Sequence, residues 1–210
     1  GLLLYLAHIA ASLCVGLLFR FYRPGEGPRP GRHAAPQFQA ASFPVAFTHS
    51  ITGALSSTLN ICAFVLFFTV VIRMLFLSGV MGALAGGAAA LLSPLGLDQA
   101  WAQRLITGLL ELSSGVSSLT GAGTVTGRLS MAAFMLGWAG ISVHCQVLSF
   151  IGGSGLSVGT YLVGKLLHGG LSALFIAVLV RLFPLEAPVS DYLADQVAGI
   201  AGMDFHRTLV

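Results

Sequence analysis

The chain has 210 residues, of which 56% are hydrophobic and only 8% are charged. Soluble domains carry about 25% charged residues, so this chain cannot cover a water-facing surface and we expect lipid to be its solvent. The formal net charge is +3, but the basic residues form no stripe and no recognition motif, so nucleic acid is not an expected partner.

The first apolar run, residues 2–19, contains no acidic residue and His8 as its only basic side chain, and its length suits a membrane-spanning helix. Residues 20–33 follow with three prolines, three glycines and four arginines, which predicts a loop. The positive-inside rule places this basic loop on the cytoplasmic side. Backbone groups in lipid must be paired within the segment, and runs that are apolar all round favour helices over a barrel.

Residues 43–59 mix aromatic and aliphatic side chains with His49, serines and threonines, which predicts an amphipathic helix lying in the membrane interface. Residues 60–77 predict a spanning helix that is interrupted only by Arg73. Residues 79–92 are apolar but short, and the spacing of Gly82 and Gly86 lets helices approach closely.

The second half of the chain contains apolar segments that are interrupted by polar residues and glycine. Residues 105–119 carry Glu111 and several serines, and residues 129–151 are long enough to span but have a polar middle. We expect loops at 93–103 and 152–155, a helix break at 120–127, a long helix at 158–183 that carries Lys165 and His168, and an acidic amphipathic tail at 184–210.

These expectations define an all-α fold. The chain is predicted to be a polytopic transmembrane helical protein with broken or re-entrant helices and an interfacial amphipathic helix. Three regions follow from the patterning: the first spanning helix and basic loop at 1–33, a helical membrane domain at 34–183, and the tail at 184–210. Because the chain starts directly in an apolar run, we expect it to be the C-terminal portion of a longer protein.

The two interrupted segments carry the candidate binding residues. Irregular backbone at membrane depth is tolerated only where it is buried in protein or lines a wet cavity, and transporters use such broken helices to bind substrates and ions. Glu111 is the only acidic residue inside a predicted membrane segment, which makes it a functional candidate. The candidates for substrate or ion binding are Glu111, Ser113, Ser114, Gly115, Gly137, Gly140, Ser142, His144 and Gln146.

Other interpretations of these residues remain open. The serines and glycines are also typical of a close-packed helix interface, and Glu111 could form a structural ion pair with Arg73 or Arg104. No metal site is expected, because His144 and Cys145 are adjacent and point about 100° apart on a helix. No cofactor is expected. The sequence contains no enzyme signature of a nucleophile, zinc or phosphate site, so an enzyme is not predicted.

Four segments together resemble a known family: VGLLFRFY at 15–22, ICAFVLFFTVVIRML at 61–75, GLLELSSGV at 108–116 and AFMLGWAGISVHCQVLSFI at 133–151. They are similar to the sporulation integral membrane proteins of the YlbJ (SpoVV) type. That family belongs to the nucleoside-recognition Gate domain superfamily, which is related to concentrative nucleoside transporters. The resemblance covers nearly the whole chain and corresponds to the C-terminal half of the family.

The resemblance implies a bacterial membrane protein that moves dipicolinic acid, a small planar dianion, into the developing forespore. Its expected partners are therefore the lipid bilayer, a small anionic substrate, the N-terminal half of the same protein and a possible second copy of the chain. Beside a dianion, a lone Glu111 would repel the substrate, so it would instead bind a coupling cation or proton, or pair with an arginine. Two alternatives are a non-transporting membrane subunit that docks partner helices and a nucleoside-type transporter.

Overall fold

A computed structural model describes residues 1–22, 42–151 and 156–183 of the chain. Most of the predicted basic loop, the predicted turn at 152–155 and the predicted acidic tail at 184–210 lie outside these described residues. Within the described residues the structure is helical and contains no strand. Its elements are α1 (Leu2–Arg20), α2 (Phe43–Leu77), α3 (Val80–Leu92), the short 3-10 helix η1 (Ser93–Leu95), α4 (Gln99–Leu110), α5 (Leu112–Ser117), α6 (Val125–Trp138), α7 (Gly140–Ile151) and α8 (Val158–Leu182).

The helices are long and apolar enough to make this an all-α polytopic membrane protein, as predicted. Four stretches could each cross a bilayer, namely α1, α2, the Val125–Ser149 stretch of α6 and α7, and α8. A fifth crossing arises if Val80–Leu95 and Gln99–Leu110 act as one broken span, since the two parts meet at 109°. The α6–α7 stretch is the most enclosed of the four, since 56% of its 18-residue apolar window is buried.

The predicted helix at 43–59 is not separate from the predicted span at 60–77. The structure continues without a break from Phe43 to Leu77, so α2 is a single helix of 35 residues. The serines and threonines of its first half do not interrupt the helix, because their hydroxyls bond backwards to carbonyls of the preceding turn, as Ser50 does to Ala46. All residues from Phe43 to Cys62 are exposed.

The predicted loop at 93–103 is shorter than expected. Asp98 accepts a hydrogen bond at 2.8 Å from the main-chain N–H of Trp101 and thereby starts α4 at Gln99. The predicted break at 120–127 is confirmed, because α5 ends at Ser117 and α6 begins only at Val125. There Thr124 caps the helix by accepting a hydrogen bond from the main-chain N–H of Gly127.

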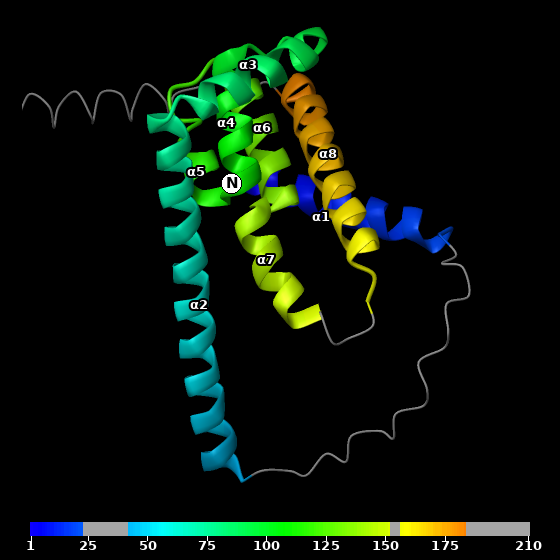
Figure 1. The fold of residues 1–210 in the computed structure, drawn as a ribbon. Coiled ribbons are helices and arrows are strands. Elements are labelled where there is room, and N and C mark those ends of the chain that lie inside the picture. The colour runs from blue at the N-terminus through cyan, green and yellow to red at the C-terminus, as the bar shows by residue number, and fades with distance from the viewer. Residues whose placement is uncertain (23–41, 152–155, 184–210) are drawn as a thin grey trace, which may run out of the picture.

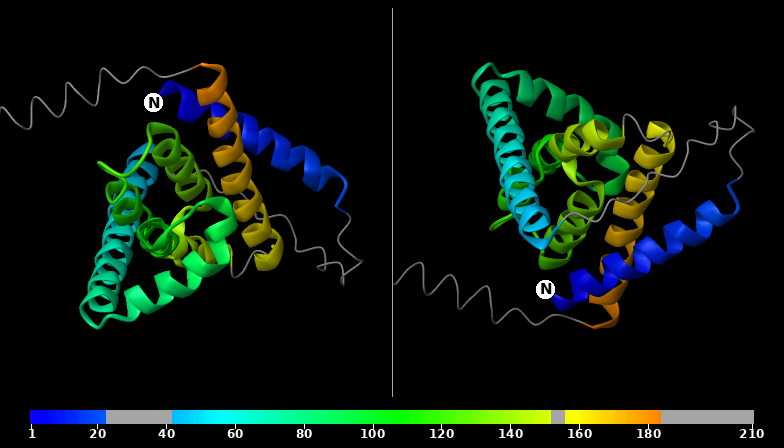
Figure 2. Two further views of the ribbon diagram at one scale, coloured as in Figure 1. Left: turned by 90° about the horizontal axis from the view of Figure 1, so that it is seen from above. Right: turned by 90° about the horizontal axis from the view of Figure 1, so that it is seen from below.

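The broken helices lie at the centre of the molecule. Figure 1 shows α4, α5, α6 and α7 between the long α2 and the tilted α8, with α3 running across one end. The two end-on views in Figure 2 agree that α2, α3 and α8 surround this central group and that α1 crosses the outer side of α8. An apolar cluster of Ala7, Ala133, Ile176 and Val180 joins α1, α6 and α8.

Two glycines bring α6 and α8 into backbone contact. A Cβ atom added to Gly137 would lie 2.5 Å from the Cα atom of Gly169, which is far inside van der Waals contact. Conversely, a Cβ atom on Gly169 would lie 2.9 Å from the carbonyl oxygen of Phe134. Only glycine permits so close a crossing, and small residues at such crossings are typical of membrane helices.

Candidate functional site: two helix breaks that meet

The first break is at Glu111, where α4 ends and α5 begins. Glu111 is in extended conformation, with φ −142° and ψ 120°, and its side chain is only 1% exposed. Its two carboxylate oxygens accept hydrogen bonds from the main-chain N–H groups of Ser113 at 2.9 Å and Ser114 at 2.7 Å. The carboxylate therefore caps α5, which satisfies amides that would otherwise be unpaired at the helix start.

The second break separates α6 from α7. Ala139 and Gly140 both adopt left-handed conformations, with φ of 81° and 80°, between the end of α6 at Trp138 and the start of α7. A non-glycine residue in this conformation is uncommon, which marks Ala139 as a constrained position. The two breaks fall at Glu111 and beside Gly140, so the prediction of broken helices in both segments is confirmed.

The two breaks lie against each other. A Cβ atom on Gly140 would lie 3.1 Å from the main-chain nitrogen of Leu112, 3.3 Å from the carbonyl oxygen of Gly108 and 3.4 Å from the Cα atom of Glu111. The indole Nε1 of Trp138 donates a hydrogen bond at 3.3 Å to the carbonyl oxygen of Leu109. Residues nearly thirty positions apart in the sequence thus form one irregular region.

The start of α7 presents three buried polar side chains in this region. Ser142, His144 and Gln146 are 0%, 4% and 8% exposed, respectively. His144 Nδ1 lies 3.0 Å from the hydroxyl of Tyr161 on α8, and its ring packs edge-on against Trp138 with centroids 4.4 Å apart. Within the described part of the chain, Ser142 Oγ, His144 Nε2 and Gln146 Nε2 are buried without a hydrogen-bond partner.

The other predicted site residues have different surroundings. Gly137 forms the helix crossing with Gly169, and Gly115 packs so closely on Gly108 that an added Cβ would overlap its backbone. Gly137 and Gly115 therefore lie at close contacts between main-chain segments. The Ser113 side chain is exposed and that of Ser114 is half-buried, whereas the main-chain N–H groups of both bind Glu111.

The structural ion pair considered for Glu111 is not formed. The guanidinium of Arg104 donates through Nε to the carbonyl oxygen of Ser118 at 3.0 Å and lies over the ring of Trp101. Arg73 is exposed on α2. The partners of Glu111 are instead the two amides of α5 that it caps.

Two contributors to the region were missed by sequence reasoning. Trp138 connects the two breaks, and Tyr161 bonds to His144 from α8. A sequence signal existed for Tyr161, because Tyr161, Lys165, His168 and Ser172 are spaced by four, three and four residues in an otherwise apolar helix. Such spacing places polar side chains on one helical face.

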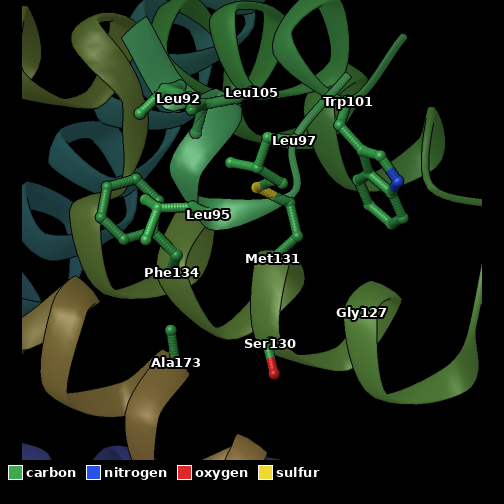
Figure 3. Close-up of a pocket in the computed structure, with 10 residues that line it drawn as sticks. All are labelled: Leu92, Leu95, Leu97, Trp101, Leu105, Gly127, Ser130, Met131, Phe134 and Ala173. Atoms are coloured by element: carbon green, nitrogen blue, oxygen red, sulfur yellow. The ribbon is translucent and has the colours of Figure 1, made fainter. Parts of the chain in front are cut away.

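An apolar pocket of about 400 Å³ lies apart from the two helix breaks (Figure 3). It is bounded by α6, by α8 and by the bend between α3 and α4. Its lining contains none of the predicted site residues and offers almost no hydrogen-bonding groups, so it is suited to hydrocarbon rather than to an anion. The lining residues are Leu92, Leu95, Leu97, Trp101, Leu105, Gly127, Ser130, Met131, Phe134 and Ala173.

The described residues contain no group of three or more His, Cys, Asp or Glu side chains that could hold a metal ion. Cys14, Cys62 and Cys145 are free thiols in the structure. No protein family, curated protein or solved structure matches this chain. The fold and the paired breaks therefore define the class of this molecule as a polytopic helical membrane protein with a buried polar centre.

Proposed function

We propose that this chain forms part of a membrane transporter that moves a small anionic metabolite past the two helix breaks. The observation that supports this most directly is the set of buried, unpartnered polar atoms at the start of α7: Ser142 Oγ, His144 Nε2 and Gln146 Nε2. Buried polar groups are normally satisfied, because each unpaired group in an apolar medium costs several kcal/mol. A polar ligand between the breaks would supply the missing partners.

The charge distribution around the breaks favours an anion. The first turn of α7 carries the positive end of the helix dipole, which attracts negative charge. The nearby carboxylate of Glu111 is already bonded to two amides of α5, so its charge is partly neutralised. A ligand with carboxylate oxygens complements this helix end better than a cation does.

The resemblance to the YlbJ-type sporulation proteins suggests the substrate. Dipicolinic acid carries two carboxylates on a planar ring, and movement of this dianion into the forespore is what the resemblance implies. We therefore propose dipicolinate as the first substrate to test and the forespore membrane as the site of action. Because a nucleoside-type transporter is the alternative, nucleosides are tested for uptake beside dipicolinate and other small anions.

Uptake of labelled dipicolinate into liposomes that contain the purified protein tests this proposal. We expect uptake by the wild type and a reduction of about tenfold or more in His144→Leu and Ser142→Ala, because each removes a polar group from the buried centre. The matched controls are His49→Leu and Ser12→Ala, whose side chains are exposed on α2 and α1, and we expect both to keep the wild-type rate.

Two results would contradict the proposal at different levels. If the wild type takes up no member of an anion and nucleoside panel, the transport function is wrong. If it takes up dipicolinate and both buried-site variants match their exposed controls, transport stands and the assignment of the site is wrong. Size-exclusion profiles of each variant in detergent show that loss of uptake is not loss of folding.

A second candidate function is a non-transporting membrane subunit that docks a partner helix. It is favoured by α3, where Gly82 and Gly86 have open space around the position of an added Cβ atom, so a small-residue face is left uncovered. We expect chemical crosslinking in native membranes to capture an adduct through cysteines introduced beside these glycines. Recovery of the monomer alone would argue against this function.

A further inference from the structure

A second group of polar contacts lies along α8, which His8 of α1 and His144 of α7 each approach. His168 Nε2 lies 3.2 Å from the carbonyl oxygen of His8 and 3.4 Å from its Nδ1, and that Nδ1 lies 3.1 Å from Ser172 Oγ. About two helical turns before His168, Tyr161 bonds to His144 of α7. We call the α8 side chains Tyr161, Lys165, His168 and Ser172 the polar stripe.

Lys165 occupies the middle of the polar stripe. The spacing of four, three and four residues places the stripe on one helical face over about 16 Å of helix length. Lys165 is half-buried, and its charge lies within electrostatic range of His8, His144 and His168. One cationic side chain thus lies among three imidazoles contributed by three helices.

The cluster contains no carboxylate to balance this charge. Among the described residues the acidic side chains are Asp98 and Glu111, and both cap helices, Asp98 through the amide of Trp101 and Glu111 through two amides of α5. The ammonium group of Lys165 has no hydrogen-bond partner within the described part of the chain. Burying an ionisable group at membrane depth costs free energy, so such groups are usually paired or functional. A bound anion would therefore stabilise Lys165, because no carboxylate of the described residues lies beside it.

Further buried groups around Lys165 are also unsatisfied. The ring atoms His8 Nε2 and His144 Nε2 are buried and lack partners in the described structure. His8 lies on α1 beside Ser172, and His144 lies on α7 beside Tyr161, so these two rings contact opposite ends of the polar stripe. A ligand with two carboxylates could bond to a cation and to imidazole N–H groups at once, and such charge-assisted bonds are the strong ones.

We propose that Lys165, flanked by His144 and His168, is the counter-charge that binds a carboxylate of the transported anion. This inference rests on the proposed transport function and deepens it, because it assigns the anion to α8 and leaves the breaks to provide neutral donors. Trp138 and His144 connect the two places, since Trp138 bonds to Leu109 at the first break and packs on His144. Lys165 was not among the residues predicted to form the site.

Calorimetric titration of the full chain in lipid nanodiscs tests the inference. The probes are dipicolinate and pyridine-2,6-dicarboxamide, which has a similar shape but no charge. We expect the wild type to bind dipicolinate and to bind the neutral diamide at least about tenfold more weakly, because the diamide cannot form a charge-assisted bond to Lys165. Lys165→Met should weaken dipicolinate binding by about 10- to 100-fold, and Lys165→Arg should restore most of it.

Arg181→Met is the matched control, because Arg181 is an exposed cation in the last turn of the same helix. It should bind dipicolinate as the wild type does. Methionine is favoured over lysine in lipid, so the Lys165→Met variant should fold, and Lys165→Gln replaces it if the methionine variant elutes as aggregate.

The possible failures are distinguishable from one another. If a folded Lys165→Met or Lys165→Gln variant binds dipicolinate with wild-type affinity, the inference is wrong and the transport function still stands. Lys165 would then extend to the membrane interface instead of binding the anion. Equal affinity for the dianion and the neutral diamide overturns the inference as well. A wild type that neither binds nor takes up dipicolinate or any other member of the anion and nucleoside panel removes both the transport function and the inference.

Discussion

Replacing Gly137 with alanine is expected to destabilise the protein by about 1–3 kcal/mol, the usual cost of overpacking a tight interface. The added methyl group would lie 2.5 Å from the Cα and 2.7 Å from the nitrogen of Gly169, and main-chain atoms cannot move aside as a flexible side chain can. The α6 and α8 helices would have to separate, and the contacts around His168 would change with them. The midpoint of thermal unfolding in detergent measures this effect.

The neighbouring glycines of α8 provide an internal control. A Cβ atom on Gly169 would meet the carbonyl oxygen of Phe134 at 2.9 Å, whereas one on Gly170 has no atom within 4 Å. Gly169→Ala should therefore destabilise the fold, and Gly170→Ala should leave it unchanged or stabilise it by up to about 1 kcal/mol through helix propensity. Equal unfolding midpoints for the two adjacent variants would show that the α6–α8 crossing is not as close as described.

Replacing Glu111 with alanine is expected to destabilise the fold by about 2–4 kcal/mol and to abolish uptake, because two part-buried amides lose their acceptors at about 1–2 kcal/mol each. Those amides belong to Ser113 and Ser114, and the carboxylate that caps them is 1% exposed. Glu111→Asp should retain most of the stability, since aspartate is also a good helix cap.

The comparison variant for this effect is Asp98→Ala. Asp98 caps α4 through a single hydrogen bond to Trp101 at an exposed position, so its loss should cost only about 1 kcal/mol. Thermal unfolding and dipicolinate uptake are measured on the same preparations of both variants. A Glu111→Ala protein as stable as Asp98→Ala would mean that the carboxylate does not hold α5 in place. Full stability with no uptake would instead assign Glu111 to ion or proton binding.

That both segments are interrupted could be predicted, although the helix cap at Glu111 was not, and the chemistry at both breaks is local. Glu111, with serines two and three positions ahead, has the pattern of a helix cap, and Gly140 can adopt a left-handed conformation without strain. The expected separation of α2 into two helices, which the structure does not show, has a local cause too. Polar residues in its first half suggested an interface, but threonine and serine satisfy their own hydroxyls within a helix, so they do not end it.

The partners of the candidate site could not be predicted, because they come from distant segments. Gly137 was chosen as a binding residue from its place in a polar motif, and its packing role depends on Gly169, which lies on another helix. In the same way, Tyr161 and His8 become neighbours of His144 and His168 only once α1, α7 and α8 pack together. A single sequence shows which face of a helix is polar but does not show which helix lies against that face.

The length of α2 has a consequence for the depth at which its residues lie. A helix of 35 residues is about 52 Å long, whereas the hydrocarbon layer is about 30 Å thick. Even at a tilt of about 40°, the upper end of the usual range, it covers about 40 Å along the bilayer normal. Roughly 10 Å of α2 therefore has to extend beyond the acyl chains. The end around Thr48 and Ser50 is rich in hydroxyl groups, so it is the part suited to headgroups and water.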